Sequence, residues 1–426
     1  MPRSVHGGVT EETNTWADSQ VLRVRNFKSI KAADIPLAPF TIIYGPNGSG
    51  KSSLLHAILA LKNIAMNPNQ APGGFFNFGY ANLGGLPAVA HNHSATTPVE
   101  ISLSGDANGE AAEFKVVIAE NQGKLVLTLQ NGPGSADRFD LSVSFPYPLN
   151  QGVKRQISRE GHSFNLTWNG VTGQIEAGSS SQELLATANA FLAFVNGITG
   201  GLKNIAVVPP MRSFTEPQYA AAVVSPLAVK AEEVATILSN EKYLEQRVSH
   251  YLEKIVDRDF RVHTKPATSF FTLDVTDRRT GMGTELVNDG SGVGQLVYLL
   301  ARCLQESTTR VCIEEPELHL HPTAVRRLAS ALVDIYEEDG KRFLINTQSE
   351  AFIVSILALV RTGRLKASEV AIFLARKERK VTTFERQVVN DRGQVEGGLA
   401  SFVEAELEDI RAFLGEDHPP TSGEAR

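Results

Sequence analysis

Residues 44–53 read Tyr-Gly-Pro-Asn-Gly-Ser-Gly-Lys-Ser-Ser, and the rest of the chain is best interpreted outward from this stretch. It matches the phosphate-binding loop G-x-x-x-x-G-K-[ST], and the apolar run 40–44 before it predicts a buried strand. Apolar residues recur at helical spacing after it, so the loop opens a helix whose N-terminus favours an anion. We expect Lys51 to reach the β- and γ-phosphates of a nucleotide and the Ser52 hydroxyl to ligate Mg²⁺. The predicted nucleotide-binding residues are Gly45, Pro46, Asn47, Gly48, Ser49, Gly50, Lys51, Ser52 and Ser53.

The bulk composition bounds the class of protein. The chain has 426 residues, is 42% hydrophobic and carries a net charge of −6, which suits one large core or two ordinary ones. This net charge gives no indication that the protein as a whole binds nucleic acid, although it does not exclude a local basic face. Cys303 and Cys312 lie in apolar runs and are expected to be buried thiols. We find no signal-peptide core in the first 20 residues and no apolar run of membrane-spanning length, so we expect a soluble cytoplasmic protein without a membrane partner.

The remaining pattern divides the chain into a β-rich and an α/β section. Residues 99–178 alternate apolar and polar side chains in short runs separated by turn residues, which is typical of antiparallel β structure. Helical structure is predicted over 182–196 and 227–257, with a strand at 205–208 between them. From 286 onward we expect helices at 294–305, 323–337, 350–361 and 401–414, and strands at 310–314, 342–346, 370–374 and 381–389.

A second candidate for nucleotide chemistry follows the strand predicted at 310–314. Residues 310–322 read Arg-Val-Cys-Ile-Glu-Glu-Pro-Glu-Leu-His-Leu-His-Pro. An apolar strand that ends in two carboxylates is the pattern of a Walker B segment, although two solvated acids at a strand end would give the same letters. Because successive strand residues point to opposite faces, the two acids need not share a role. Glu314 fits the acid associated with Mg²⁺, and Glu315 fits the residue that orients and deprotonates the attacking water.

Two other polar segments are candidates for ligand contacts. Residues 288–295 form a second glycine-rich turn that leads into a helix, which predicts another anion-binding N-terminus. His319 and His321 alternate with leucines and could face one side as metal ligands, but we do not favour a metal there.

The order of these motifs resembles the ABC-class ATPases of the SMC/RecF/OLD type, and most closely their compact prokaryotic members without long coiled coils. The resemblance covers 21 to about 414, and its last motif is the most specific. The stretches that carry it are residues 22–30 (Leu-Arg-Val-Arg-Asn-Phe-Lys-Ser-Ile), 45–53, 208–212 (Val-Pro-Pro-Met-Arg), 289–295 (Asp-Gly-Ser-Gly-Val-Gly-Gln) and 313–322 (Ile-Glu-Glu-Pro-Glu-Leu-His-Leu-His-Pro).

The resemblance implies a mechanical role for ATP and Mg²⁺. In this class two heads meet face to face, and each ATP is held by one subunit's phosphate-binding loop and the other subunit's signature loop. A homodimer through the ATP sites is therefore expected, with His319 and His321 at its seam. The residues expected to act in trans on the γ-phosphate are Ser291, Gly292, Gly294 and Gln295.

The sequence departs from the family pattern in two respects. Where the family has a switch histidine, residues 345–349 read Ile-Asn-Thr-Gln-Ser, and Gln348 can hydrogen-bond a phosphate or a water but cannot carry a proton. Slow hydrolysis is expected, with Glu315, Lys51 and Gln348 as the catalytic residues. The helical segment at 227–257 is too short for a long coiled coil, and no nuclease domain is expected after 414. The family's Q-loop is not located within 75–93.

The sequence thus predicts an α/β fold: a P-loop ABC-type ATPase head with an antiparallel β-rich insertion and a short helical insertion. The expected divisions are a tail at 1–20, the core at 21–98 with the phosphate-binding loop, the β-rich insertion at 99–226, a helical and β insertion at 227–285, the core at 286–414 and a tail at 415–426.

The expected function is a dimeric, ATP-hydrolysing switch in prokaryotic anti-phage defence or genome maintenance. Because no other catalytic cluster is evident, a separate effector protein, with a nuclease as one candidate, is expected to respond to the conformational change. Two alternatives stay open: a scaffold that ATP stabilises without hydrolysis, and a RecF-like repair ATPase that binds DNA.

Overall fold

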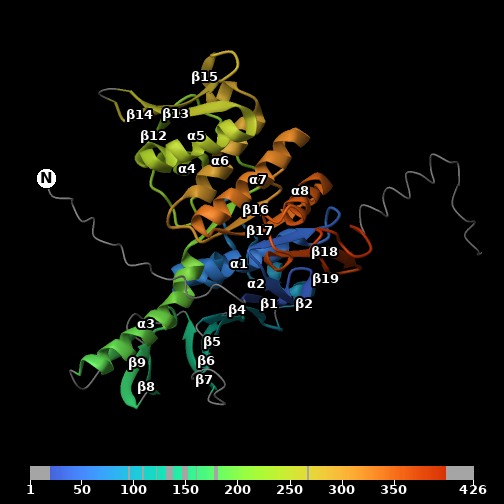
Figure 1. The fold of residues 1–426 in the computed structure, drawn as a ribbon. Helices are drawn as coiled ribbons and strands as arrows, with labels where there is room; N and C mark the ends of the chain where they lie inside the picture. The colour runs from blue at the N-terminus through green and yellow to red at the C-terminus, as the bar shows by residue number, and fades with distance from the viewer. Residues whose placement is uncertain are drawn as a thin grey trace, which may run out of the picture.

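A computed structural model describes residues 20–399 except 95, 108–109, 121, 131–137, 146–151, 160, 177–180 and 266–267. Figure 1 shows two sheets around a central helix, a helical lobe at one end and an arm at the other. The predicted tails at 1–20 and 415–426, apart from residue 20, and the helix predicted over 401–414 lie outside the described residues.

A mainly parallel sheet forms the centre, with strand order β11-β16-β17-β3-β18-β19. Five strands run parallel and β19 is an antiparallel edge strand. The nearly continuous apolar runs of β3, β11 and β16 are explained by burial on both faces of this sheet. The strands predicted at 205–208 and 310–314 are confirmed to the residue. The bounds are β3 (Phe40–Tyr44), β11 (Ile205–Val208), β16 (Arg310–Glu314), β17 (Arg342–Thr347), β18 (Val370–Glu378) and β19 (Val381–Gln387).

An antiparallel sheet lies beside it, with strand order β2-β1-β4-β5-β6-β7. The antiparallel structure predicted after residue 99 is confirmed, and β4 pairs directly with the N-terminal strand β1. The alternation in β1 buries Leu22 and Val24 toward the core, and Phe27 at the end of the strand is buried as well. The bounds are β1 (Gln20–Phe27), β2 (Ile30–Leu37), β4 (Val99–Ala107), β5 (Glu110–Ile118), β6 (Gly123–Gln130) and β7 (Arg138–Phe145).

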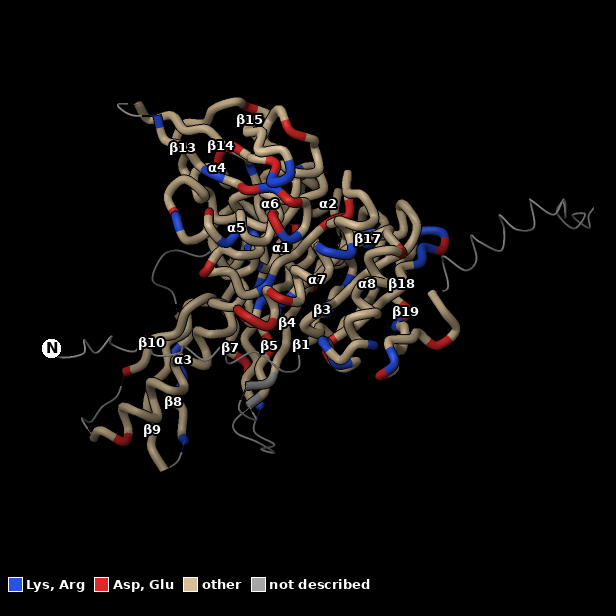
Figure 2. Tube along the Cα trace, turned by 45° about the horizontal axis from the view of Figure 1, so that its top comes forward, with Lys and Arg blue, Asp and Glu red and all other residues tan. Residues whose placement is uncertain are grey.

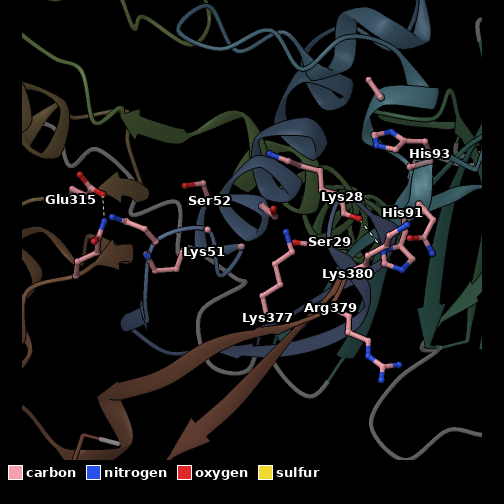
Figure 3. A pocket seen from close by; sticks show the side chains of 18 residues that line it. Lys28, Ser29, Lys51, Ser52, His91, His93, Glu315, Lys377, Arg379 and Lys380 are labelled. Carbon is pink, nitrogen blue, oxygen red and sulfur yellow. Dashed lines mark hydrogen bonds between the residues drawn. The ribbon is translucent and has the colours of Figure 1, made fainter. Parts of the chain in front are cut away.

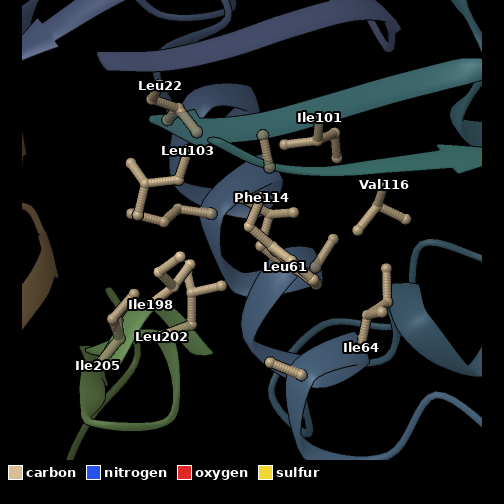
Figure 4. Packing of buried hydrophobic residues seen from close by; sticks show 14 of the residues in the cluster. Leu22, Leu61, Ile64, Ile101, Leu103, Phe114, Val116, Ile198, Leu202 and Ile205 are labelled. Carbon is tan, nitrogen blue, oxygen red and sulfur yellow. The ribbon is translucent and has the colours of Figure 1, made fainter. Parts of the chain in front are cut away.

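Helix α1 (Lys51–Met66) lies between the two sheets and is buried on nearly every side. A helix that is apolar all round needs partners on all faces, and the two sheets supply them. In Figure 4, Leu61 and Ile64 of α1 lie beside Ile101 and Phe114 of the antiparallel sheet, in the first of two hydrophobic clusters. This packing fixes the phosphate-binding loop at the N-terminal end of α1.

The arm consists of α3 (Gln182–Lys203) and the sheet of β8 (Val153–Arg159), β9 (His162–Trp168) and β10 (Gly173–Glu176) (Figure 1). The helix predicted to end at 196 continues to Lys203, because its last turns pack Ile198 and Leu202 into the first cluster. Among the described residues α3 alone is long and apolar enough, by length and composition, to cross a membrane, although polar residues interrupt its apolar sequence. One side of α3 is buried within the protein.

The other face of the central sheet and the helical lobe share the second hydrophobic cluster. The helical segment predicted over 227–257 divides in two at Glu241, whose backbone is not helical. Both cysteines are buried and free, as expected. The bounds here are α4 (Ala231–Asn240), α5 (Lys242–Val256), α6 (Ser291–Leu304), α7 (Pro322–Asp339), α8 (Glu350–Arg361), β12 (Tyr219–Ala220), β13 (Arg258–Thr264), β14 (Phe270–Asp277) and β15 (Gly283–Glu285).

The remaining short elements are α2 (Leu86–Val89) and the 3-10 turns Pro72–Phe76, His91–His93, Leu286–Asn288 and Ala367–Glu369. The parallel order, the loop between β3 and α1, and the adjoining antiparallel sheet confirm the predicted α/β fold class. The domain boundaries given above stay a prediction.

Candidate functional site: a nucleotide pocket between two sheets

The phosphate-binding loop joins β3 to α1 in a conformation that requires glycine. Gly50 has φ +98, and a Cβ atom there would lie 2.4 Å from Oγ1 of Thr382. Gly45 has φ +143, and its Cβ would lie 2.4 Å from the carbonyl oxygen of Ala375. Side chains at these two positions would therefore collide with the β18–β19 hairpin. The loop closes tightly over the N-terminus of α1, as an anion site requires.

Lys51 is held inside this loop. Its ammonium donates to the carbonyl oxygens of Gly45, at 2.8 Å, and Pro46, at 3.0 Å. Burial lowers the pKa of Lys51, while the nearby carboxylates of Glu315, Glu317 and Glu314 oppose this shift. A partly desolvated ammonium that is held only by carbonyl oxygens gains from contact with a phosphate.

Ser52 and Glu314 are brought together from positions far apart in the sequence. The Ser52 hydroxyl donates to Oε2 of Glu314 at 2.5 Å, because β16 ends beside the first turn of α1. Burial raises the pKa of the Glu314 carboxyl, and the bonds from Ser52 and Tyr80 act against this. These are the two side chains assigned to Mg²⁺ from the sequence.

Glu315 and Gln348 also meet. Nε2 of Gln348 donates to Oε1 of Glu315 at 2.6 Å. Glu315 has φ +48, a conformation that is costly for a residue with a side chain and that is concentrated at functional sites. Its amide donates to the carbonyl oxygen of Asn346 at 2.8 Å, so β17 holds the turn in place.

Arg212 holds the backbone of the same turn. Its guanidinium donates to the carbonyl oxygens of Pro209 (2.8 Å), Glu314 (2.9 Å) and Glu315 (2.9 Å). Arg212 is buried, and desolvation lowers its pKa to about 10. The proline-arginine motif at 208–212 therefore positions the Walker B acids through their backbone.

Three residues near Glu314 were missed by the sequence analysis. Tyr80 donates its hydroxyl to Oε1 of Glu314 at 3.2 Å. His56 on α1 lies 3.9 Å from the same oxygen through Nε2, and its Nδ1 lies 3.2 Å from Nζ of Lys28. Burial lowers the pKa of His56 to about 3. Tyr80 lies within residues 75–93, the segment in which the sequence did not locate a Q-loop. Its contact with Glu314 is the only feature that separates it from the other residues of this segment.

A pocket of about 580 Å³ opens over the loop. Figure 3 shows Glu315 at one side, Lys51 and Ser52 beside it, and Lys28 and His91 toward the other side. The tip of the β18–β19 hairpin lines the pocket as well, with the basic residues Lys377, Arg379 and Lys380. Along the backbone trace, basic and acidic residues are interspersed (Figure 2). The pocket is thus a locally basic site on a protein of net negative charge.

The signature loop opens α6. Ser291 is exposed, whereas Gly294 and Gln295 are buried, so Ser291 is the side chain of this loop most open to a partner. A Cβ atom on Gly292 would lie 2.6 Å from the carbonyl oxygen of His319, which explains the glycine there. The loop therefore packs against the turn that follows the Walker B strand.

The two histidines of that turn have separate environments. Nδ1 of His321 accepts a bond from the amide of Thr323 at 3.3 Å and caps α7. His319 has φ +60. In the part of the chain that the structure describes, no group of three or more His, Cys, Asp or Glu side chains could hold a metal ion.

The donor atoms beside the loop nevertheless suit Mg²⁺. A hydroxyl from Ser52 and a carboxylate from Glu314 are oxygen ligands, and Mg²⁺ in nucleotide sites is held by one or two such groups together with the phosphates. The strand order, the loop and the paired acids define a P-loop nucleotide-binding protein of the ABC type.

Two family models each match a part of this chain. A family model described as "AAA ATPase domain" matches residues 20–120. A second, described as "AAA domain, putative AbiEii toxin, Type IV TA system", matches residues 201–355.

Related proteins extend the likeness over most of the chain. The OLD nuclease of Thermus scotoductus is 24% identical over 375 residues, which are 84% of this chain and 64% of that protein. The Old nuclease of Escherichia phage P2 is 23% identical over 78% of this chain and 56% of its own length. The RecF protein of Erwinia tasmaniensis, a DNA replication and repair protein, is 34% identical over 25% of this chain and 28% of its own length. The chain thus spans less than two thirds of these relatives.

Among solved structures, the SMC head domain from Thermotoga maritima aligns with a TM-score of 0.41 at 10% identity, covering 86% of this chain and 98% of that one. The motifs, the family models and the relatives support an ABC-class ATPase of the SMC/RecF/OLD type, which is the resemblance that the sequence motifs indicate.

Proposed function

We propose that this chain binds ATP with Mg²⁺ in the pocket over the phosphate-binding loop and hydrolyses it slowly. The observation that carries the proposal is the convergence of two pairs beside Lys51. Ser52 contacts Glu314 at 2.5 Å, and Gln348 contacts Glu315 at 2.6 Å. Residues more than 250 positions apart are thus close enough to act as a phosphate ligand, a metal ligand and a base at one site.

Each side chain has a distinct part in the proposed reaction. Lys51 exchanges its bonds to loop carbonyls for the phosphates, and the N-terminus of α1 adds its backbone donors. Glu315 orients the attacking water and accepts its proton, while Gln348 holds the Glu315 carboxylate in place. When bound, Mg²⁺ would supply the positive charge that stabilises the transferred phosphoryl group.

We also propose that two copies meet through their ATP sites. The exposed Ser291 and the N-terminus of α6 would then contact the partner's γ-phosphate. Hydrolysis would release the heads, and a separate effector, with a nuclease as one candidate, would respond to this change. A cytoplasmic role in anti-phage defence or genome maintenance fits the OLD and RecF relatives.

Two substitutions test the chemistry. Lys51→Ala removes the main cation facing the phosphates, so ATP affinity should fall at least about tenfold. Glu315→Gln should bind ATP normally but hydrolyse it about 100-fold more slowly. Binding is measured with a fluorescent ATP analogue and hydrolysis by phosphate release.

The exposed residues Lys124 and Glu120 provide matched controls, and Lys124→Ala and Glu120→Gln should behave as wild type. Wild-type affinity in Lys51→Ala would contradict the site. Tight ATP binding without any phosphate release by the wild type would favour the scaffold alternative.

A further inference from the structure

Asn346, near the end of β17, has a buried side-chain amide. It is 1% exposed, and both its Oδ1 and its Nδ2 lack a hydrogen-bond partner among the described residues. A buried amide with two unpaired ends is costly, and such groups in folded proteins call for a ligand, a water or a functional reason.

The sheet register shows where this side chain points. Asn346 pairs with Glu314 on one side and with Ile43 on the other, and paired residues of parallel strands share a face. Two residues earlier, Leu344 packs in the same hydrophobic cluster as α1 and Ile43. Asn346 therefore faces the α1 side of the sheet, between the Walker B strand and the strand that enters the phosphate-binding loop.

The surroundings make a purely structural role for the amide unconvincing. The backbone carbonyl of Asn346 already accepts the amide of Glu315, so the strand does not need the side chain. Its sheet neighbour Glu314 is bonded to Ser52, at the first turn of α1. In the loop itself, the buried Oγ of Ser49 is likewise without a partner among the described residues. Unpaired polar atoms are thus gathered at the end of the sheet where the phosphates are expected.

We propose that the Asn346 amide contacts the Mg²⁺-triphosphate unit of bound ATP. Its oxygen accepts a hydrogen bond from a metal-bound water, and its NH₂ donates to an oxygen of the terminal phosphate. This contact, which rests on the proposed function, makes Asn346 a residue that distinguishes ATP from ADP, because ADP lacks the terminal phosphate.

The test separates stability from ligand binding. Asn346→Leu keeps the branching and the number of side-chain heavy atoms and removes both unpaired ends, so the nucleotide-free protein should melt at the same or a higher temperature than the wild type. Affinity for Mg²⁺-ATP should fall about tenfold or more, with a much smaller change for ADP. The two readouts are the melting temperature without nucleotide and the affinities by isothermal titration calorimetry.

Asn63→Leu is the matched control. Asn63 lies on α1, and its amide donates to the carbonyl oxygens of Phe75 and Asn77, both at 3.0 Å. That variant should melt at a lower temperature and keep the wild-type preference for ATP.

An Asn346→Leu protein with unchanged Mg²⁺-ATP affinity would overturn the inference, and so would a lower melting temperature with unchanged ATP preference. If Lys51→Ala still weakens ATP binding in that case, the proposed function survives. If the wild type itself fails to bind ATP, the proposed function fails instead.

Discussion

At the scale of single residues, burial decides which groups near Glu314 carry charge. His56 is enclosed by α1, Phe78 and Tyr80, and its ring stacks on Phe78 with centroids 5.2 Å apart. Desolvation lowers its pKa to about 3, and the Lys28 ammonium 3.2 Å from Nδ1 acts in the same direction. Neutral His56 therefore accepts from Lys28 through Nδ1, and its other nitrogen carries the proton.

This burial makes stability depend on pH. Because the pKa of His56 is lower in the folded state than its ordinary value of 6.5, its contribution is complete above pH 6.5 and is lost as pH falls toward 3. At pH 5 the loss is about 2 kcal/mol relative to neutral pH. His56→Gln should lose less stability between pH 7.5 and pH 5, measured by urea unfolding at each pH.

The raised pKa of Glu314 works in the opposite direction, so only the difference between variant and wild type reports on His56. His250→Gln changes an exposed histidine and should keep the wild-type pH dependence. Identical pH profiles for wild type and His56→Gln would show that His56 is not held neutral by burial.

At the scale of elements, the β18–β19 hairpin holds the phosphate-binding loop. The buried hydroxyl of Thr382 on β19 donates to the carbonyl oxygen of Ser49 at 2.8 Å and lies 2.7 Å from Oγ of Ser29. The amide of Thr382 donates to the carbonyl oxygen of Ser29 at 2.7 Å. One residue of an edge strand thus joins the β1–β2 turn to the loop.

Thr382→Val should loosen the loop without unfolding the sheet. The valine keeps the shape and the backbone bond but leaves the Ser49 carbonyl without this donor, so ATP affinity should fall about tenfold. Fluorescent nucleotide titration measures the affinity, and circular dichroism checks the fold. Thr383→Val, at the exposed neighbouring position, is the control. Equal affinities for the two variants would mean that the hairpin does not organise the loop.

At the scale of the whole molecule, the proposed dimer depends on the loop predicted to be the signature loop. Ser291 is exposed at the N-terminus of α6, where backbone donors and the helix dipole favour an anion. The opposite end of the same helix is capped at Gln305, and Ser307 beyond it is exposed. The two serines therefore mark the two ends of one helix.

In the slow-hydrolysis background Glu315→Gln, ATP should convert the protein from monomer to dimer, as measured by light scattering. Adding Ser291→Arg should block this conversion, because the larger side chain obstructs the approach of the partner's phosphate. Adding Ser307→Arg at the far end of α6 should leave it unchanged. Dimers that form equally with and without Ser291→Arg would contradict an interface through the signature loop.

The sequence by itself determined the parts of the protein whose signals are local. Residues 44–53 identify the phosphate-binding loop, because the turn needs glycines at fixed positions and the helix needs its start there. The strand that ends at Glu314 is confirmed to the residue, because apolar runs in parallel strands are buried on both faces. The extent of α3 and the break at Glu241 were missed, since tertiary packing decides where such helices end.

Only the tertiary structure decided which distant residues share the site. Tyr80 and His56 carry no local pattern that marks them, and the motif that contains Arg212 and the stretch that contains Asn346 do not show what these two side chains contact. Each of the four residues contacts the Walker B strand or pairs with it in the sheet. A buried polar group is recognisable only when its neighbours are known, because its cost and its pKa depend on what surrounds it. The motifs were therefore recognisable in the sequence, whereas the contacts around Glu314 were recognisable only in the tertiary structure.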